Sequence, residues 1–182
     1  MLPHRITTLP VVLRTFVSAD VARVEELCSD PAVALPTAAI PHPYPCGAAA
    51  AWIATHENER DAGTRWTYAI TNVDGDLLVG AIDLRIGSDA DGNLGYWIGR
   101  PYWGRGYATL AVRALIAMAF LGLDTDALAA VHLARNAASG RVLEKCGLTL
   151  ARREHRLHRG GPEEEICLWS ITRERWSALR AA

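Results

Sequence analysis

The chain has 182 residues, enough for one domain with its own hydrophobic core. Half of its residues are hydrophobic and its formal net charge is −1, so its composition offers neither a basic tract for nucleic acid nor an acidic disordered tail. The longest apolar stretch, residues 108–123, is too short to span a membrane, and the first residues lack the apolar segment of a signal peptide. Four scattered cysteines are expected to be reduced and mostly buried. We therefore expect one cytoplasmic α+β domain covering residues 1–182, without nucleic-acid or membrane partners.

The first half of the chain predicts strands and helices separated by irregular segments. Residues 10–16 are typical of a strand, and residues 18–27 have capping residues followed by apolar residues at helical spacing. Four prolines between residues 36 and 45 exclude regular structure there, and a second helix is predicted over 47–57. Strands at 66–71 and 77–86 flank a turn at 72–76. Residues 88–93 resemble part of a calcium loop but lack its terminal glutamate, so we interpret them as a turn and expect no metal.

The second half predicts four further strands and three helices. A short strand over 94–99 leads into an apolar helix that runs to about residue 120, and a strand ends at residue 133. A helix over 136–146 ends at a glycine, the usual C-terminal residue of a helix. Residues 148–157 and 164–171 then form a hairpin, and a short helix ends the chain near residue 179. The prediction totals about seven strands.

The most informative segment is the turn Trp-Gly-Arg-Gly at residues 103–106, directly before the apolar helix. Gly104 and Gly106 allow a tight turn and a close approach of a ligand to the backbone. The first turn of the helix presents unpaired N–H groups at the positive end of the helix dipole, and Arg105 adds a charge. The segment therefore predicts a phosphate or pyrophosphate site.

Two common phosphate-binding motifs do not fit this turn. A P-loop ends in Gly-Lys-Ser/Thr, and that run is absent from the chain. A dinucleotide fingerprint requires a third glycine, and Thr109 stands at that position. A dinucleotide-binding domain is therefore the weakest of the open interpretations.

Residues 103–108 and 136–148 together resemble the GCN5-related N-acetyltransferase (GNAT) family, and within it the Rim-type branch. The family's coenzyme A motif, Gln/Arg-x-x-Gly-x-Gly/Ala, aligns with residues 103–108, with Trp103 at its first position. Rim-type members are similar in carrying Trp-Gly-x-Gly-x-Ala-Thr there. The segment from Asn136 to Leu148 resembles the family's Asn-x-x-Ser…Glu-Lys-x-Gly-Phe block, and the whole resemblance covers about residues 12–171.

The resemblance implies the GNAT fold: a mixed, mostly antiparallel sheet of about seven strands flanked by helices, with a splayed cleft for acetyl-CoA. It implies that the strand at 96–98 pairs with the pantetheine arm and that an N–H near Trp97 or Ile98 polarises the thioester carbonyl. Asn136 contacts the cofactor or orients the amine, although its position also fits a helix cap. The residues expected to contact acetyl-CoA are Trp97, Ile98, Gly104, Arg105, Gly106, Tyr107, Ala108, Thr109 and Asn136.

The catalytic residues follow less directly from the resemblance. Leu143 occupies the position at which many relatives carry a tyrosine acid, and Rim-type relatives instead imply Ser139 as the proton donor to the leaving thiolate. Ser139 equally fits a residue that bonds the first turn of its helix. The usual glutamate base corresponds to Asn93, which leaves Asp83 as the candidate base, His132 as a second, or deprotonation through water.

The resemblance implies acetyl transfer to a primary amine. We favour a protein or peptide N-terminal α-amine, whose pKa of about 8 eases deprotonation relative to about 10.4 for lysine. A small amine (an antibiotic, a polyamine or an amino-acid derivative) remains an alternative, as does a non-catalytic acyl-CoA-binding module. The amine pocket is expected around residues 42–44 and the final hairpin, where the glutamates at 163–165 either recognise the amine or are simply solvated. The protein is expected to be a monomer or a homodimer.

Overall fold

An eight-stranded sheet organises the computed structural model, which describes residues 2–73, 77–86 and 92–181. The strand order is β1-β2-β3-β4-β5-β6-β8-β7, and all neighbours are antiparallel except β5 and β6. The mixed, mostly antiparallel sheet is thus confirmed, with one strand more than predicted. The strands are β1 (Arg5–Thr8), β2 (Val11–Arg14), β3 (Arg65–Asn72), β4 (Leu78–Arg85), β5 (Leu94–Ile98), β6 (Ala127–Leu133), β7 (Thr149–Leu157) and β8 (Glu163–Thr172).

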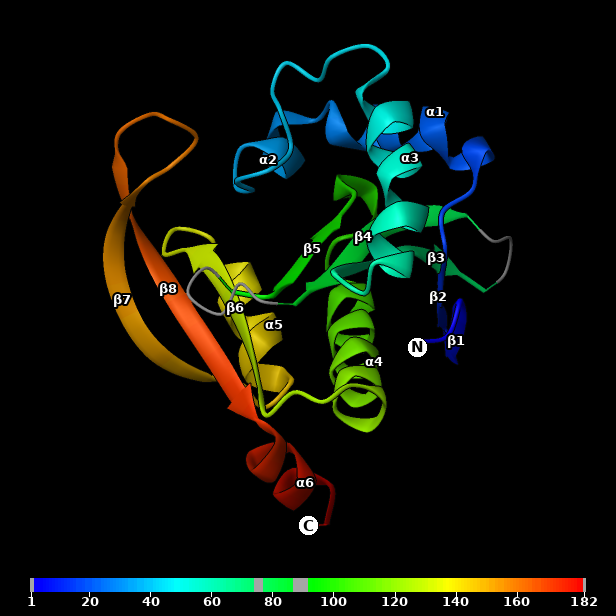
Figure 1. The fold of residues 1–182 in the computed structure, drawn as a ribbon. Coiled ribbons are helices and arrows are strands. Elements are labelled where there is room, and N and C mark those ends of the chain that lie inside the picture. The colour runs from blue at the N-terminus through cyan, green and yellow to red at the C-terminus, as the bar shows by residue number, and fades with distance from the viewer. Residues whose placement is uncertain (1, 74–76, 87–91, 182) are drawn as a thin grey trace.

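Helices lie on both faces of this sheet (Figure 1). The first strand β1 and the one-turn helix α2 were not predicted, and α3 extends four residues beyond its predicted end at residue 57. The predicted turns at 72–76 and 88–93 fall largely outside the described residues. The helices are α1 (Val21–Cys28), α2 (Pro31–Ala34), α3 (Ala48–Asp61), α4 (Tyr107–Gly122), α5 (Ala137–Lys145) and α6 (Arg173–Ala181).

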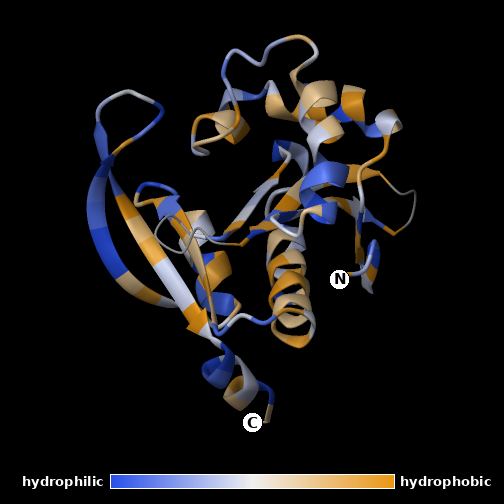
Figure 2. Cartoon of the chain, viewed as in Figure 1, coloured by the Kyte–Doolittle hydropathy of each residue, from blue (hydrophilic) through white to orange (hydrophobic). Residues whose placement is uncertain are grey.

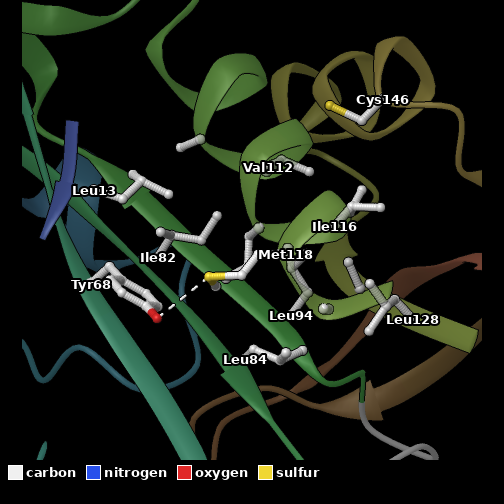
Figure 3. Close-up of a cluster of buried hydrophobic side chains, with 14 of the residues drawn as sticks. Leu13, Tyr68, Ile82, Leu84, Leu94, Val112, Ile116, Met118, Leu128 and Cys146 are labelled. Carbon is white, nitrogen blue, oxygen red and sulfur yellow. Dashed lines mark hydrogen bonds between the residues drawn. The ribbon is translucent and has the colours of Figure 1, made fainter. Parts of the chain in front are cut away.

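Helix α4 forms the centre of the larger hydrophobic core. Leu115, Ile116 and Phe120 are almost fully buried, and burial of each such side chain contributes roughly 2 kcal/mol. Figure 3 shows this helix against β3 and β4, where Tyr68 lies beside Met118 with its hydroxyl 3.5 Å from the sulfur. Because α4 is apolar nearly all round, as the colouring of Figure 2 shows, it is held firmly against the sheet. Its N-terminus is therefore fixed in position.

A smaller core covers the opposite face of the sheet. Val24 of α1 and Ala49 of α3 pack with Ala69 of β3 and Leu78 of β4. Trp52, His56 and Phe16 form an edge-to-face aromatic cluster beside it, with ring centroids 4.5–5.2 Å apart. This second layer joins α1 and α3 to the strands that carry the site.

Strands β5 and β6 separate almost as soon as they meet. Among the described residues their register contains a single pair, Leu94 with Ala130. Two hydrogen bonds of Asn93 join the start of β5 to β6 here. The Asn93 N–H donates to the Ala129 carbonyl at 2.9 Å, and its side-chain Oδ1 accepts from the Ala129 N–H at 2.8 Å. Beyond it the strands diverge (Figure 1), which confirms the predicted splay. The sheet continues on the far side through β6, β8 and the outer strand β7.

In the part of the chain that the structure describes, no helix has the length and apolarity needed to cross a membrane. Cys28, Cys146 and Cys167 are buried and Cys46 is exposed, and all four thiols are free, as expected.

Candidate active site

A cavity of about 430 Å³ lies at the splay, between β5, the turn at 103–106 and helix α5. Nearly all of the residues predicted from the sequence to hold the cofactor meet here. The predicted residues that line the cavity are Trp97, Ile98, Gly104, Gly106, Tyr107, Ala108, Thr109, Asn136 and Ser139.

The glycine turn has the geometry of an anion site. Gly104 and Gly106 have φ values of 75° and 79°, a conformation that residues with a Cβ rarely adopt. A Cβ built on either glycine would meet no atom within 4 Å, so open space lies beside the backbone where a ligand would approach. Helix α4 begins at Tyr107, and its first N–H groups have no partner within the helix. This cradle fits a pyrophosphate.

Arg105 behaves differently from its two neighbours. Its side chain is exposed and does not line the cavity, and its guanidinium lies 5.7 Å from the ring centre of Tyr102. Only the backbone of Arg105 therefore belongs to the turn in this structure.

Two features on this side of the cavity were missed from the sequence. The Trp103 indole donates to the Ile98 carbonyl at 2.6 Å and so joins the glycine turn to the end of β5. Arg141 and Lys145 of α5 also line the cavity and bring positive charge to it. The spacing of Ala138, Arg141, Val142 and Lys145, which places them on one helical face, was a signal that could have identified them.

A second cavity, of about 570 Å³, continues from the first one. Tyr96, Trp97, Asn136 and Ser139 line both cavities, so they stand where the two spaces join. The second cavity extends between β4 and β5 on one side and β6 and the β7–β8 hairpin on the other, and is bounded by the segment between α2 and α3. The first cavity contains the glycine turn, and the second cavity extends from the junction in another direction.

Ser139 is held at this junction by a side chain that the sequence interpretation did not consider. Its hydroxyl lies 2.7 Å from the Tyr96 hydroxyl, which also lies 3.3 Å from the Ser139 carbonyl. Burial raises the pKa of Tyr96, although the hydrogen bond with Ser139 lowers it in part. Tyr96 therefore keeps its proton at neutral pH. The Asn136 side chain accepts from the Ser139 N–H at 3.3 Å and caps α5.

The candidate bases each have other partners. The Asp83 Oδ2 atom lies 3.0 Å from Arg65 Nε and 3.6 Å from Arg85 Nε, so Asp83 lines the second cavity as an ion-paired carboxylate. Both ring nitrogens of His132 are engaged, because Nδ1 bonds the Leu133 carbonyl at 2.8 Å and Nε2 accepts from the Trp169 indole at 2.9 Å. Burial also lowers the pKa of His132.

Asn93 occupies the position at which relatives carry a glutamate base, and here it has a structural role. It is 2% exposed and engages Ala129 through both its backbone and its side chain. It does not line either cavity. Asn93 thus fixes the point from which β5 and β6 diverge.

The hairpin tip forms one wall of the second cavity. Arg159 donates to the carbonyl of Ala34, the last residue of α2, and to those of Thr37 and Ile40 beyond it. The His158 ring lies 3.0 Å from the Leu35 carbonyl. Of the segment 42–44 predicted to shape the amine pocket, Tyr44 lines this cavity and His42 does not. The glutamates at 163–165 do not line this cavity. Glu164 pairs with Arg135, and Glu165 pairs with Arg153.

Comparison with known proteins agrees with this geometry. Residues 11–149 match the acetyltransferase (GNAT) domain family. No curated protein matches the chain by sequence. Among solved structures, a GNAT-family acetyltransferase from Bacillus anthracis superposes with a TM-score of 0.81 at 19% identity, covering 93% of this chain and 99% of that one.

Two further structures contain the nucleotide cosubstrate. The ribosomal-protein α-N-acetyltransferase RimL, in complex with coenzyme A, has a TM-score of 0.78 at 14% identity and covers 94% of this chain and 97% of its own. The microcin C7 self-immunity acetyltransferase MccE, in complex with acetyl-CoA and AMP, has a TM-score of 0.78 at 16% identity and covers 91% and 93%.

The chain belongs to the GNAT acetyltransferase family. It is an N-acetyltransferase that uses acetyl-CoA as acyl donor, and the cradle at 104–109 fits the phosphates of that donor.

Proposed function

We propose that this enzyme acetylates the N-terminal α-amine of a peptide or protein, in the manner of the Rim-type branch. The junction of the two cavities at Ser139 carries the proposal, because it offers one space for the acyl donor and a second space for the acceptor. RimL, whose fold the chain shares, is named as an α-N-protein acetyltransferase. The second cavity would receive the first residues of the acceptor.

The scarcity of a free base also favours an α-amine. Among the described residues, the candidates Asp83, His132 and Asn93 are held by ion pairs or hydrogen bonds. An α-amine with a pKa of about 8 has a useful neutral fraction near pH 7.5, whereas lysine at about 10.4 has very little. Water in the second cavity would carry the proton away.

The thioester of acetyl-CoA supplies the activated acyl group. The amides of residues 104–109, with Arg141 and Lys145, would hold its phosphates. The backbone N–H of Ile98 would polarise the acetyl carbonyl. The Ile98 C=O accepts from the Trp103 indole on the cleft side of β5. In a strand, the N–H and C=O of one residue point to the same edge. The Ile98 N–H therefore faces the cleft and is a better candidate than the Trp97 N–H.

Ser139 would stabilise the departing thiolate. In this role its hydroxyl would donate toward the cavity while its oxygen accepts from Tyr96, so that the tyrosine would fix the orientation of the serine. As the amine nitrogen bonds to the acyl carbon and the carbon–sulfur bond breaks, the sulfur takes the serine proton. The serine regains a proton from the acetylated amine nitrogen through water, while Tyr96 keeps its own.

The proposal is tested by incubating the enzyme with acetyl-CoA and peptides that carry a free α-amine, a blocked α-amine with an internal lysine, or both amines. Thiol release gives the rate, and mass spectrometry of fragments locates the acetyl group. Acetylation of the α-amine alone supports the proposal. Acetylation of lysine, of polyamines or of aminoglycosides with no reaction at α-amines would replace it with a different acceptor.

A further inference from the structure

Among the described residues, most of the charged side chains that line the acceptor cavity are arginines. Its charged lining consists of Arg65, Asp83, Arg85 and Arg156, with His158 beside them. Asp83 is the one carboxylate that lines it among the described residues. This is the opposite of the glutamate-lined pocket that would suit a polyamine or an aminoglycoside.

On the sheet side, one carboxylate is shared by two arginines. Arg65 and Arg85 both approach Oδ2 of Asp83, at 3.0 and 3.6 Å, and their side chains are 26% and 41% exposed. Glu59, which does not line the cavity, lies 3.9 Å from Arg65. Arg85 also donates to the Gly92 carbonyl at 3.2 Å, so its guanidinium is held in place.

This arginine pair lies close to the reacting point. Asp83 is paired in register with Gly95, and the next pair on the same face is Ala81 with Trp97. Two residues of a strand span about 7 Å, so Asp83, which both arginines contact, lies roughly that far along the strands from Trp97. A Cβ on Gly95 would lie 2.9 Å from Asp83 Oδ1, so glycine at this position leaves room for the carboxylate.

On the side of the β7–β8 hairpin, two arginines again share one carboxylate. Arg152 and Arg156 of β7 both pair with Glu154, and Arg156 faces the acceptor cavity. Arg156 thus brings positive charge to the wall opposite Arg85. An acceptor that enters between them meets arginines on both sides.

We infer that the acceptor carries a carboxylate close to its reactive α-amine, and that Arg85 and Arg65 bind this carboxylate. The inference rests on the proposed function and narrows it to acidic acceptors. Either an aspartate or glutamate side chain at the start of a peptide or the α-carboxylate of a free amino acid supplies this chemistry, and the peptide side chain is the better match to the separation along β5.

The test compares kcat/KM for two matched pairs of acceptors: peptides that begin with Asp or with Asn, and free alanine or alaninamide. The first pair isolates a side-chain carboxylate, and the second isolates an α-carboxylate. We expect the Asp peptide to exceed the Asn peptide by about tenfold or more, because charge-assisted hydrogen bonds are stronger than neutral ones.

The variant Arg85→Gln should remove most of this preference, and Arg85→Lys should restore part of it. Arg5→Gln is the matched control, since Arg5 is exposed on β1 and lines neither cavity. Raising the salt concentration should also reduce the preference of the unaltered enzyme, which keeps the test valid if a variant folds poorly.

The outcomes separate the two proposals. A preference confined to the alanine pair supports the inference and identifies a free amino acid as the source of the carboxylate. Equal turnover within both pairs overturns the inference but leaves α-amine acetylation standing. Reaction with lysine or polyamines only, and with none of these α-amines, overturns both.

Discussion

At the scale of single residues, the contact between Tyr96 and Ser139 is the centre of the account. The two hydroxyls lie 2.7 Å apart, one on β5 and one on α5, across the splay of the sheet. Tyr96 keeps its proton because burial raises its pKa, so it can act as a donor to Ser139 throughout the neutral range.

We predict that Ser139→Ala lowers kcat roughly a hundredfold, since it removes the group that protonates the leaving thiolate. Tyr96→Phe should lower kcat less, by about fivefold, because it removes one orienting hydrogen bond. Steady-state kinetics measure both effects, and a coenzyme A titration should show a nearly unchanged Kd. An additive double variant would contradict the coupling of the two residues.

His56 gives a separate prediction about stability. Burial, Arg65 and Arg60 lower its pKa from 6.5 to about 4, so the folded protein holds the neutral ring. As pH falls below 6.5, the unfolded chain binds a proton at His56 that the folded chain does not. Stability from this source is therefore complete above pH 6.5 and is lost progressively toward pH 4.

The loss should amount to on the order of 3 kcal/mol, and His56→Phe should remove it while keeping the aromatic packing with Trp52 and Phe16. Urea unfolding at several pH values measures the free energy of unfolding of both proteins. The difference between them cancels the contribution of the other titrating groups. Parallel pH dependences would show that His56 is not responsible.

At the scale of elements, the start of α4 determines donor binding. The cradle depends on the left-handed conformation of Gly106, and a Cβ there would project into the open space beside the turn. We predict that Gly106→Ala weakens coenzyme A binding at least about tenfold, through backbone strain of about 1–2 kcal/mol and lost space.

Gly63→Ala is the matched control, because Gly63 has a φ of 67°, equally open surroundings and no place in either cavity. Calorimetric titration with coenzyme A should show its Kd unchanged. An equal loss in both variants would attribute the effect to general strain and not to the cradle.

The divergence of β5 and β6 gives a second prediction at this scale. Asn93→Ala leaves the partly buried Ala129 N–H without its acceptor, which should cost about 1 kcal/mol and lower Tm by several degrees. Asn58→Ala, at an exposed position of α3, should leave Tm nearly unchanged. If the two variants melt alike, Asn93 does not hold the strands together.

At the scale of the whole molecule, features that depend on local chemistry were predictable from sequence. Gly104 and Gly106 predicted a tight turn, which the structure forms in the left-handed region, and the apolar sequence of α4 predicted a buried helix. The four-residue β1 was missed because half-buried and exposed residues alternate in it over too short a length to give a clear pattern. The one-turn α2 was missed for the same reason of length.

Features that depend on strand register could not be predicted from the sequence. Nothing local indicates that Asn93 contacts Ala129 or that Asp83 lies between two arginines from adjacent strands. Tyr96 and Ser139 are 43 positions apart, and only the fold brings them together. The candidate base was therefore the least predictable part of the site, whereas the donor cradle was the most predictable.

The most direct test of the central claim is a crystal structure of the enzyme with a bisubstrate analogue in which coenzyme A is linked through an acetyl group to the α-amine of a peptide. We predict the phosphates at residues 104–109, the sulfur within hydrogen-bonding distance of Ser139 Oγ, the carbonyl oxygen at the Ile98 N–H, and the peptide in the second cavity. A peptide that leaves the junction by another route, with the sulfur distant from Ser139, would contradict it.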